Sequence, residues 1–272
     1  MAKKSTSSKS STATKTTVTK VKTNKGNFLK DTTLVGKGIA EFVGTFLLVA
    51  SIFATQGQPL FVAFALIGLV LIFGGISGSH LNPAITIGAL ATKKVSGKTS
   101  LVYIVAQVLG ALAAFALFSG LLNVTVPATD AADSVYANSQ QLFHAVDISA
   151  DDSTTKGKEW VLFVAEIIGV FALSLGVSVA LREKKERLAA AAGVGLALLV
   201  GLLMAGSVTG VLLAESNTTL TFLNPAVALA GYVAGGINMF SLWPLMVFVV
   251  APAVGGVLGF ALSDLLEKTQ KD

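Results

Sequence analysis

The tripeptide Asn-Pro-Ala occurs twice, at Asn82-Pro83-Ala84 and at Asn224-Pro225-Ala226, each time at the start of a short apolar stretch. Asn is a favoured helix N-cap, and Pro fits the first helical position, where no N–H is needed. Each tripeptide therefore predicts a helix start, and the small Ala lets two such starts touch. Two facing helix N-termini would offer N–H donors and partial positive charge, which bind a neutral acceptor such as a water oxygen and repel cations.

The composition places this chemistry in a membrane. Of 272 residues, 53% are hydrophobic and 13% are charged, whereas soluble domains carry about 25% charged residues. About 20 apolar residues cross a bilayer as a helix. Six such segments are predicted, at 35–55, 60–77, 100–122, 159–181, 188–210 and 241–264. The two Asn-Pro-Ala segments, 82–92 and 224–234, are too short to cross.

The positive charges predict the orientation. If the N-terminus is inside, 18 of the 20 Lys and Arg lie on the inner side, and the long outer loop 123–158 is acidic. This follows the positive-inside rule, so we expect a multi-pass protein of the plasma membrane with both termini in the cytoplasm. Residues 1–33, rich in Lys, Ser and Thr, are interpreted as a disordered cytoplasmic tail, either attracted to lipid headgroups or simply solvated. Residues 266–272 form a second, short cytoplasmic tail.

The chain contains an internal repeat. Residues 40–48, AEFVGTFLL, match residues 165–173, AEIIGVFAL, in five of nine positions. Each half then has three spans, which is an odd number, so the second half enters from the opposite side and makes an inverted repeat over 34–122 and 159–265. Two ten-residue half-helices rise about 15 Å each and would together replace one span of about 30 Å.

Other readings of these residues remain open. The tripeptides could be plain caps in a sealed bundle, and Glu41 and Glu166, as intramembrane carboxylates, could relay protons in a coupled transporter. The absence of Cys and the presence of two His exclude a multi-histidine or thiolate metal site. No nucleophile–base pair or phosphate-binding loop is recognisable, so we expect no enzyme activity, no metal, no cofactor and no nucleic-acid partner.

The chain resembles the aquaporin, or major intrinsic protein, family over residues 35–265. The resemblance depends on the two repeat motifs, on SGSHLNPAITIG and LNPAVALA around the tripeptides, on QVLGA at 107–111 and on APAVGG at 251–256. It implies an all-α membrane protein, a right-handed bundle of six transmembrane helices with two re-entrant half-helices in one channel domain, 34–265. It also implies a homotetramer with one pore per subunit that passes water and small neutral solutes.

The resemblance also implies roles for three further residues. Glu41 and Glu166 would hold the backbone of the two re-entrant loops by hydrogen bonds. His80 would line or brace the pore, or would be an ordinary hydrogen-bonded loop residue.

The sequence departs from the family at its narrow filter. Family members usually carry Arg directly after the second Asn-Pro-Ala, and here that residue is Val227. The corresponding filter is predicted as Val62, Leu202, Thr221 and Val227, with no charge and one hydroxyl. Such a ring would pass neutral solutes larger than water, such as glycerol, urea, undissociated metalloid acids or ammonia, or it would dewet and slow water.

A long segment before the second tripeptide, 207–222, is a second departure from the family pattern. It predicts either a lid over the pore mouth or a passive insertion. A structural membrane protein with a closed pore is the remaining alternative.

Overall fold

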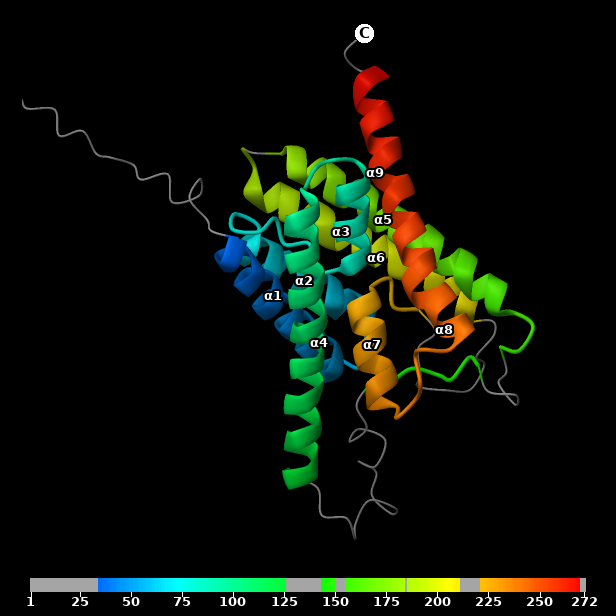
Figure 1. The fold of residues 1–272 in the computed structure, drawn as a ribbon. Helices are drawn as coiled ribbons and strands as arrows, with labels where there is room; N and C mark the ends of the chain where they lie inside the picture. The colour runs from blue at the N-terminus through cyan, green and yellow to red at the C-terminus, as the bar shows by residue number, and fades with distance from the viewer. Residues whose placement is uncertain (1–33, 126–142, 150–154, 184, 211–220, 270–272) are drawn as a thin grey trace, which may run out of the picture. The chain divides into compact units, whose positions relative to one another are not determined.

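The computed structural model describes residues 34–125, 143–149, 155–183, 185–210 and 221–269. These residues form helices and the loops between them (Figure 1). The helices are α1 (Leu34–Ala54), α2 (Pro59–Phe73), α3 (Pro83–Ala91), α4 (Gly97–Thr125), α5 (Glu159–Arg182), α6 (Arg187–Gly210), α7 (Pro225–Ala234), α8 (Leu242–Leu245), η2 (Met246–Val250) and α9 (Ala251–Thr269). The predicted tail 1–33 and most of the segment 207–222 lie outside the described residues.

Five helical stretches among the described residues are long and apolar enough to cross a membrane. They are Leu34–Ala54, Gly97–Leu121, Glu159–Arg182, Arg187–Gly210 and Leu242–Thr269. Each coincides with a predicted span, and the all-α prediction is confirmed. The first four residues of the segment 207–222 belong to α6, in agreement with the predicted span 188–210.

The second predicted span, 60–77, is too long. Helix α2 ends at Phe73 and has 15 residues, which rise about 22 Å and fall short of a full crossing. Residues 74–78 continue in turns, with Ser77 N–H donating to the Phe73 carbonyl. Gly78 then adopts a φ of 90°, a left-handed conformation that glycine tolerates best, and the chain turns back towards Asn82. The apolar run therefore includes the first part of the re-entrant loop.

The last predicted span is one continuous helical segment that contains a π-helical turn. Residues Leu242–Leu245 are α-helical, Met246–Val250 form a π-helix, and Ala251–Thr269 are α-helical again. Pro252 lies just after the π-helix and cannot donate to the carbonyl of Phe248, with which its ring would also collide. The π-turn accommodates this proline within the span.

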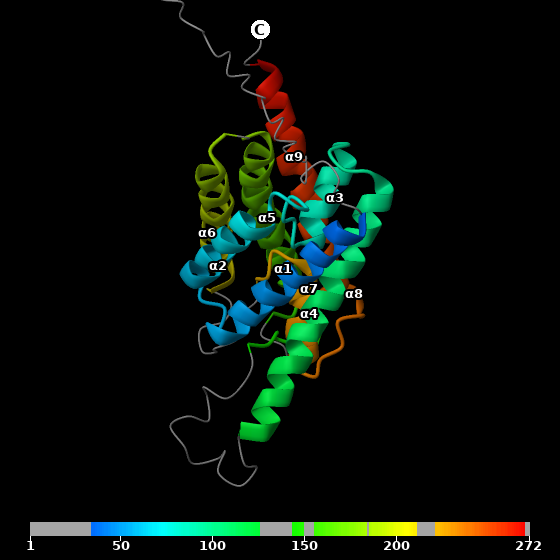
Figure 2. The same cartoon turned by 90° about the vertical axis from the view of Figure 1, so that its left-hand side faces the viewer.

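The two halves exchange their half-helices. In the first half α1 packs on α4, and in the second half α5 packs on α9. The short α3 packs against α9 of the second half, while α7 packs against α4 of the first half, and α2 contacts α6 (Figures 1 and 2). The half-helices therefore join the two repeats and bring both Asn-Pro-Ala tripeptides into the middle of the bundle.

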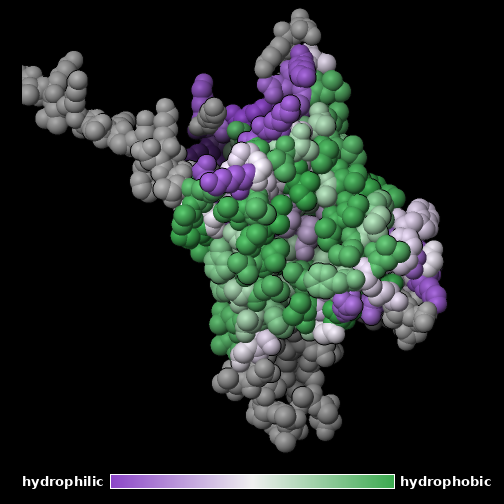
Figure 3. Space-filling view, in the orientation of Figure 1, coloured by the Kyte–Doolittle hydropathy of each residue, from purple (hydrophilic) through white to green (hydrophobic). Residues whose placement is uncertain are grey.

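The surface divides into an apolar belt and a charged end. Large apolar side chains such as Phe64, Leu101 and Trp160 point outwards, as expected for contact with lipid. Hydrophilic residues gather where α9 finishes (Figure 3). We call this the basic end, because Lys93, Lys94, Arg182 and Arg187 lie there. Two ion pairs link α9 to its neighbours at this end, Lys94–Asp264 at 2.7 Å and Arg182–Glu267 at 2.8 Å.

A prediction concerns the crossing of α1 and α4. A methyl group on Gly110 would collide with the backbone carbonyl of Phe42, whereas a methyl on Gly68 in α2 would meet nothing within 4 Å. We expect Gly110→Ala to cost about 1–3 kcal/mol through overpacking. Gly68→Ala should be neutral or slightly stabilising. Thermal unfolding of the two variants in detergent tests this, and equal midpoints would contradict it.

Candidate functional site

The two half-helices begin at the predicted tripeptides. Asn82 caps α3 with an extended backbone, and its Oδ1 accepts a hydrogen bond from Ala84 N–H at 2.8 Å. Asn224 caps α7 in the same way, and its Oδ1 accepts from Ala226 N–H at 3.0 Å. Pro83 and Pro225 occupy the first helical positions, where a missing N–H leaves nothing unsatisfied.

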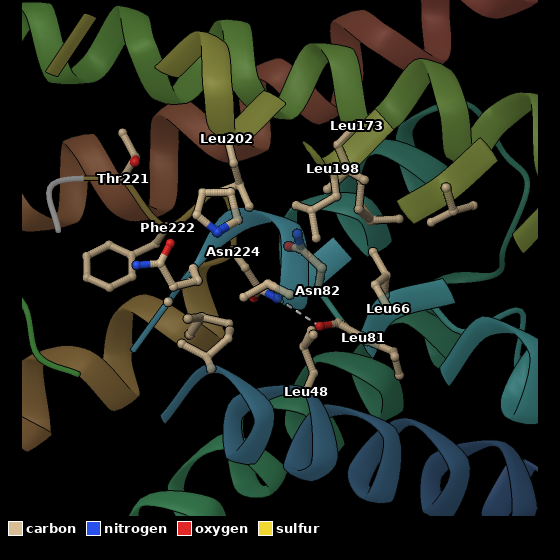
Figure 4. Close-up of a pocket in the computed structure, with 18 of the residues that line it drawn as sticks. Leu48, Leu66, Leu81, Asn82, Leu173, Leu198, Leu202, Thr221, Phe222 and Asn224 are labelled. Atoms are coloured by element: carbon tan, nitrogen blue, oxygen red, sulfur yellow. Dashed lines mark hydrogen bonds between the residues drawn. The ribbon is translucent and has the colours of Figure 1, made fainter. Parts of the chain in front are cut away.

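The two Asn side chains also connect the repeats. Asn82 Nδ2 donates to the carbonyl of Leu223, and Asn224 Nδ2 donates to the carbonyl of Leu81, both at 2.8 Å. Leu81 and Leu223 have φ values of 48° and 55°, which turn their carbonyls towards the opposite loop. Figure 4 shows the two amides close together in the centre of the bundle. One side-chain N–H of each Asn is thus used to bind the loop of the other repeat.

Glu41 holds the first re-entrant loop. Its two carboxylate oxygens accept from the backbone N–H groups of His80 at 3.0 Å and Leu81 at 2.7 Å. They also accept from the Ser77 hydroxyl at 2.5 Å and from Gln107 Nε2 at 2.7 Å. The carboxylate is fully buried and satisfies loop donors for which lipid offers no partner.

Glu166 holds the second loop in the related way. Its oxygens accept from the backbone N–H groups of Phe222 at 2.6 Å and Leu223 at 2.9 Å. Neither Glu166 nor Glu41 lies on the wall of the central cavity. The geometry therefore favours a supporting role for both carboxylates over direct contact with a solute.

A cavity of about 270 Å³ passes beside the two Asn amides. Liquid water takes about 30 Å³ per molecule, so several waters fit. Its wall is mainly aliphatic, and equivalent positions of the two repeats contribute to it. Leu48 and Leu173, which come seven residues after Glu41 and Glu166, both line it, as do Ile52 and Val177.

All four predicted filter residues lie on the wall of this cavity: Val62, Leu202, Thr221 and Val227. They come from α2, α6, the second re-entrant loop and α7, so the structure brings together positions that are far apart in sequence. Leu202, Thr221 and the neighbouring Leu198 are seen around the cavity in Figure 4. No Lys or Arg is present among the cavity-lining residues described here.

His80 contacts a residue of α3 and also lines the central cavity. Its Nδ1 lies 3.1 Å from the Thr86 hydroxyl, and its ring stands edge-on to Tyr103 with centroids 5.2 Å apart. The side chain is 5% exposed and lines the central cavity as well as a second cavity at the basic end. Lining the cavity and forming a hydrogen bond from the loop are therefore compatible roles for His80.

Three contributing residues were not predicted from the sequence. Ser77 and Gln107 lay inside quoted motifs, but nothing in their spacing connected them to Glu41. Phe143 lies in the long loop between α4 and α5, without a motif, yet its ring is part of the cavity wall. Only the folded chain brings these side chains to the site.

Known proteins are similar to this chain in sequence. The sequence profile of the family "Major intrinsic protein" matches residues 58–263. Aquaporin AqpM of Methanothermobacter thermautotrophicus is 30% identical over 72% of this chain and 70% of its own. Glycerol uptake facilitator protein-like 6 of Lactiplantibacillus plantarum is 27% identical over 82% of this chain and 94% of its own. Aquaporin Z of Rhodopseudomonas palustris is 31% identical over 85% of this chain and 92% of its own.

The fold has a counterpart among solved structures. The X-ray structure of the aquaglyceroporin from Plasmodium falciparum aligns with a TM-score of 0.60 and 22% identity, covering 88% of this chain and 98% of that one. Opposed half-helices beside a lined cavity, inside a membrane-spanning bundle, define a channel rather than an enzyme. The chain belongs to the major intrinsic protein family, whose members are channels for water or small solutes such as glycerol.

A prediction tests the bonds between the repeats. Asn224→Asp keeps the capping oxygen but replaces the Nδ2 donor with an oxygen that faces the Leu81 carbonyl. We expect a loss of about 1–3 kcal/mol or more, because a buried acceptor loses its partner and a charge is added. The matched control is Asn238→Asp, an exposed residue whose Oδ1 only accepts from Phe240 N–H. Thermal unfolding in detergent should be lowered for Asn224→Asp alone, and equal lowering in both variants would refute the bridging role.

Proposed function

We propose that this chain is a passive channel for water and small neutral solutes, and that it excludes ions and protons at the paired half-helix N-termini. The observation that carries the proposal is the position of Asn82 and Asn224 on the cavity wall. An amide nitrogen carries two hydrogens, and the loop bonds use one of each, so a second N–H remains for a water oxygen. Donors fixed on both sides orient that water and interrupt a proton relay.

The helix ends supply the barrier to cations. Each N-terminus carries roughly half a positive charge. At an effective dielectric constant near 20, two such ends about 5 Å from a monovalent cation oppose it by about 3 kcal/mol. Without an Arg in the filter, this central barrier is the main electrostatic one that the cavity-lining residues provide.

The filter favours neutral solutes larger than water. Val62, Leu202, Thr221 and Val227 form an uncharged wall with one hydroxyl, and Val227 is smaller than the Arg usual in the family. The relatives include both aquaporins and a protein named as a glycerol uptake facilitator. Glycerol and urea are therefore the first solutes to test, followed by undissociated metalloid acids and ammonia. A broad facilitator with little preference for water is the second candidate, and Val227 is the residue that favours it.

Two rival functions are disfavoured by the site. A coupled transporter would need Glu41 or Glu166 on the pathway, but both bond to their own loops and lie off the cavity wall. A structural protein with a sealed pore would not need a lined cavity between two capped helix starts. Passive transport therefore accounts best for the residues around the cavity.

We further propose how the chain is oriented in the membrane and that it assembles into an oligomer. The basic end, with Lys93, Lys94, Arg182 and Arg187, faces the cytoplasm because cytoplasmic loops are enriched in Lys and Arg. In this orientation the predicted filter faces outwards, in the plasma membrane. The family resemblance favours a homotetramer with one pathway in each subunit.

The proposal is tested by reconstituting the full chain in liposomes and following light scattering by stopped flow. In a sucrose gradient we expect faster shrinkage than in empty liposomes, and in glycerol or urea we expect faster re-swelling. Neither rate should depend on a pH or sodium gradient, since a passive channel needs only the solute gradient. Rates equal to those of empty liposomes would refute the open channel, and gradient-driven uptake would favour a transporter.

A substitution at Val227 tests how the filter sets the permeability of larger solutes relative to that of water. Val227→Arg adds a bulky fixed charge at the narrow ring, so glycerol and urea permeability should fall by about tenfold while water permeability falls less. Val227→Leu adds volume without charge and separates the two effects. Unchanged solute permeability in both variants, at equal reconstituted amounts, would place the filter elsewhere.

A further inference from the structure

The mouth of the cavity at the end opposite the basic end contains an aromatic ring outside the four filter positions. Phe143 is 7% exposed, and its side chain lines the cavity together with Gln58, Thr221 and Phe222. We propose that Phe143 is a further specificity-determining residue, which narrows the entrance and limits the size of neutral solute that reaches the filter. This inference depends on the proposed function, because it assumes that solutes pass through this cavity.

Phe143 is fixed between the two repeats. Its ring stands edge-on to that of Phe222, with centroids 5.9 Å apart and an interplanar angle of 81°. On the other side it packs on the backbone of Gly57, where even a methyl group would collide with the ring. Gly57 and Phe222 also line the cavity. The ring therefore lies across the entrance between the loop after α1 and the second re-entrant loop.

The segment that carries Phe143 is anchored to α7. Ala145 N–H donates to the Gly231 carbonyl at 3.1 Å, and the side chains of Ala145 and Ile148 are almost fully buried. Farther along, the Ser149 hydroxyl lies 3.2 Å from the Ser241 hydroxyl. Helix α7 also carries Val227, so the entrance ring and the filter share one support, and the ring is held in place rather than free to swing aside.

The chemistry of the entrance follows from its lining. A phenyl ring offers no hydrogen bond, whereas Gln56 and Gln58 place amides at the same mouth. A polyol or urea must pass the ring while it loses water, so the ring adds both a steric and a desolvation barrier. Water is smaller and keeps its hydrogen bonds to neighbouring waters in single file. Removing the ring should therefore affect larger solutes more than water.

The test compares permeability ratios in liposomes for the full chain and three variants. Phe143→Ala should raise the ratio of glycerol or urea permeability to water permeability by at least about threefold, and Phe143→Leu should give a smaller rise. The matched control is Phe240→Ala, which removes a ring that is 74% exposed at the same end and lies off the cavity wall. Its ratio should equal that of the wild type.

The ratio separates a filter role from a packing role, because loss of folded protein lowers all permeabilities together. Size-exclusion profiles of each variant verify the fold, and if Phe143→Ala is lost, Phe143→Leu alone decides. Wild-type transport with unchanged ratios in the folded Phe143 variants would overturn this inference and leave the proposed function intact. Absence of any transport by the wild type would overturn both.

Discussion

Leu81 and Leu223 precede the two capping Asn residues, and their backbone groups hold the halves of the protein together. The N–H of each Leu donates to the carboxylate of its own repeat, Glu41 or Glu166, while its carbonyl accepts from the Asn of the other repeat. Non-helical backbone at membrane depth must be satisfied by protein, because lipid offers no partner. Neither loop can satisfy itself, so the site exists only when both repeats are folded together.

The two repeats differ in the residues that support their re-entrant loops. Gly110 and Gly255 pack in related positions against the backbones of Phe42 and Ile167. Three residues before each lie Gln107, which donates to Glu41, and Pro252, which follows the π-helix and has no N–H. Glu41 thus accepts from two side-chain donors, Ser77 and Gln107, in addition to the two backbone N–H groups of the first loop. The second repeat has no side-chain donor at this position, because Pro252 replaces the glutamine there.

Helix α7 connects the central, filter and entrance features of the pathway. Its first turn carries the Asn224 cap and Val227, and its last turn binds the segment 143–149 through Gly231. In the proposed mechanism these features act in sequence: an aromatic entrance, an uncharged filter and a central pair of amides. A ten-residue helix rises about 15 Å, so its first turn can line the cavity while its last turn holds the segment that carries Phe143.

The sequence by itself determined the elements that depend on local chemistry. The half-helices begin where Asn-Pro-Ala predicts them, and most spans begin and end close to the predicted residues, because apolar length and capping are properties of neighbouring residues. The end of α2, the π-turn before Pro252, the partners of the Asn amides and the place of Phe143 could not be predicted. They depend on contacts between residues distant in the chain, since a buried donor or ring takes whichever partner the folded neighbours supply.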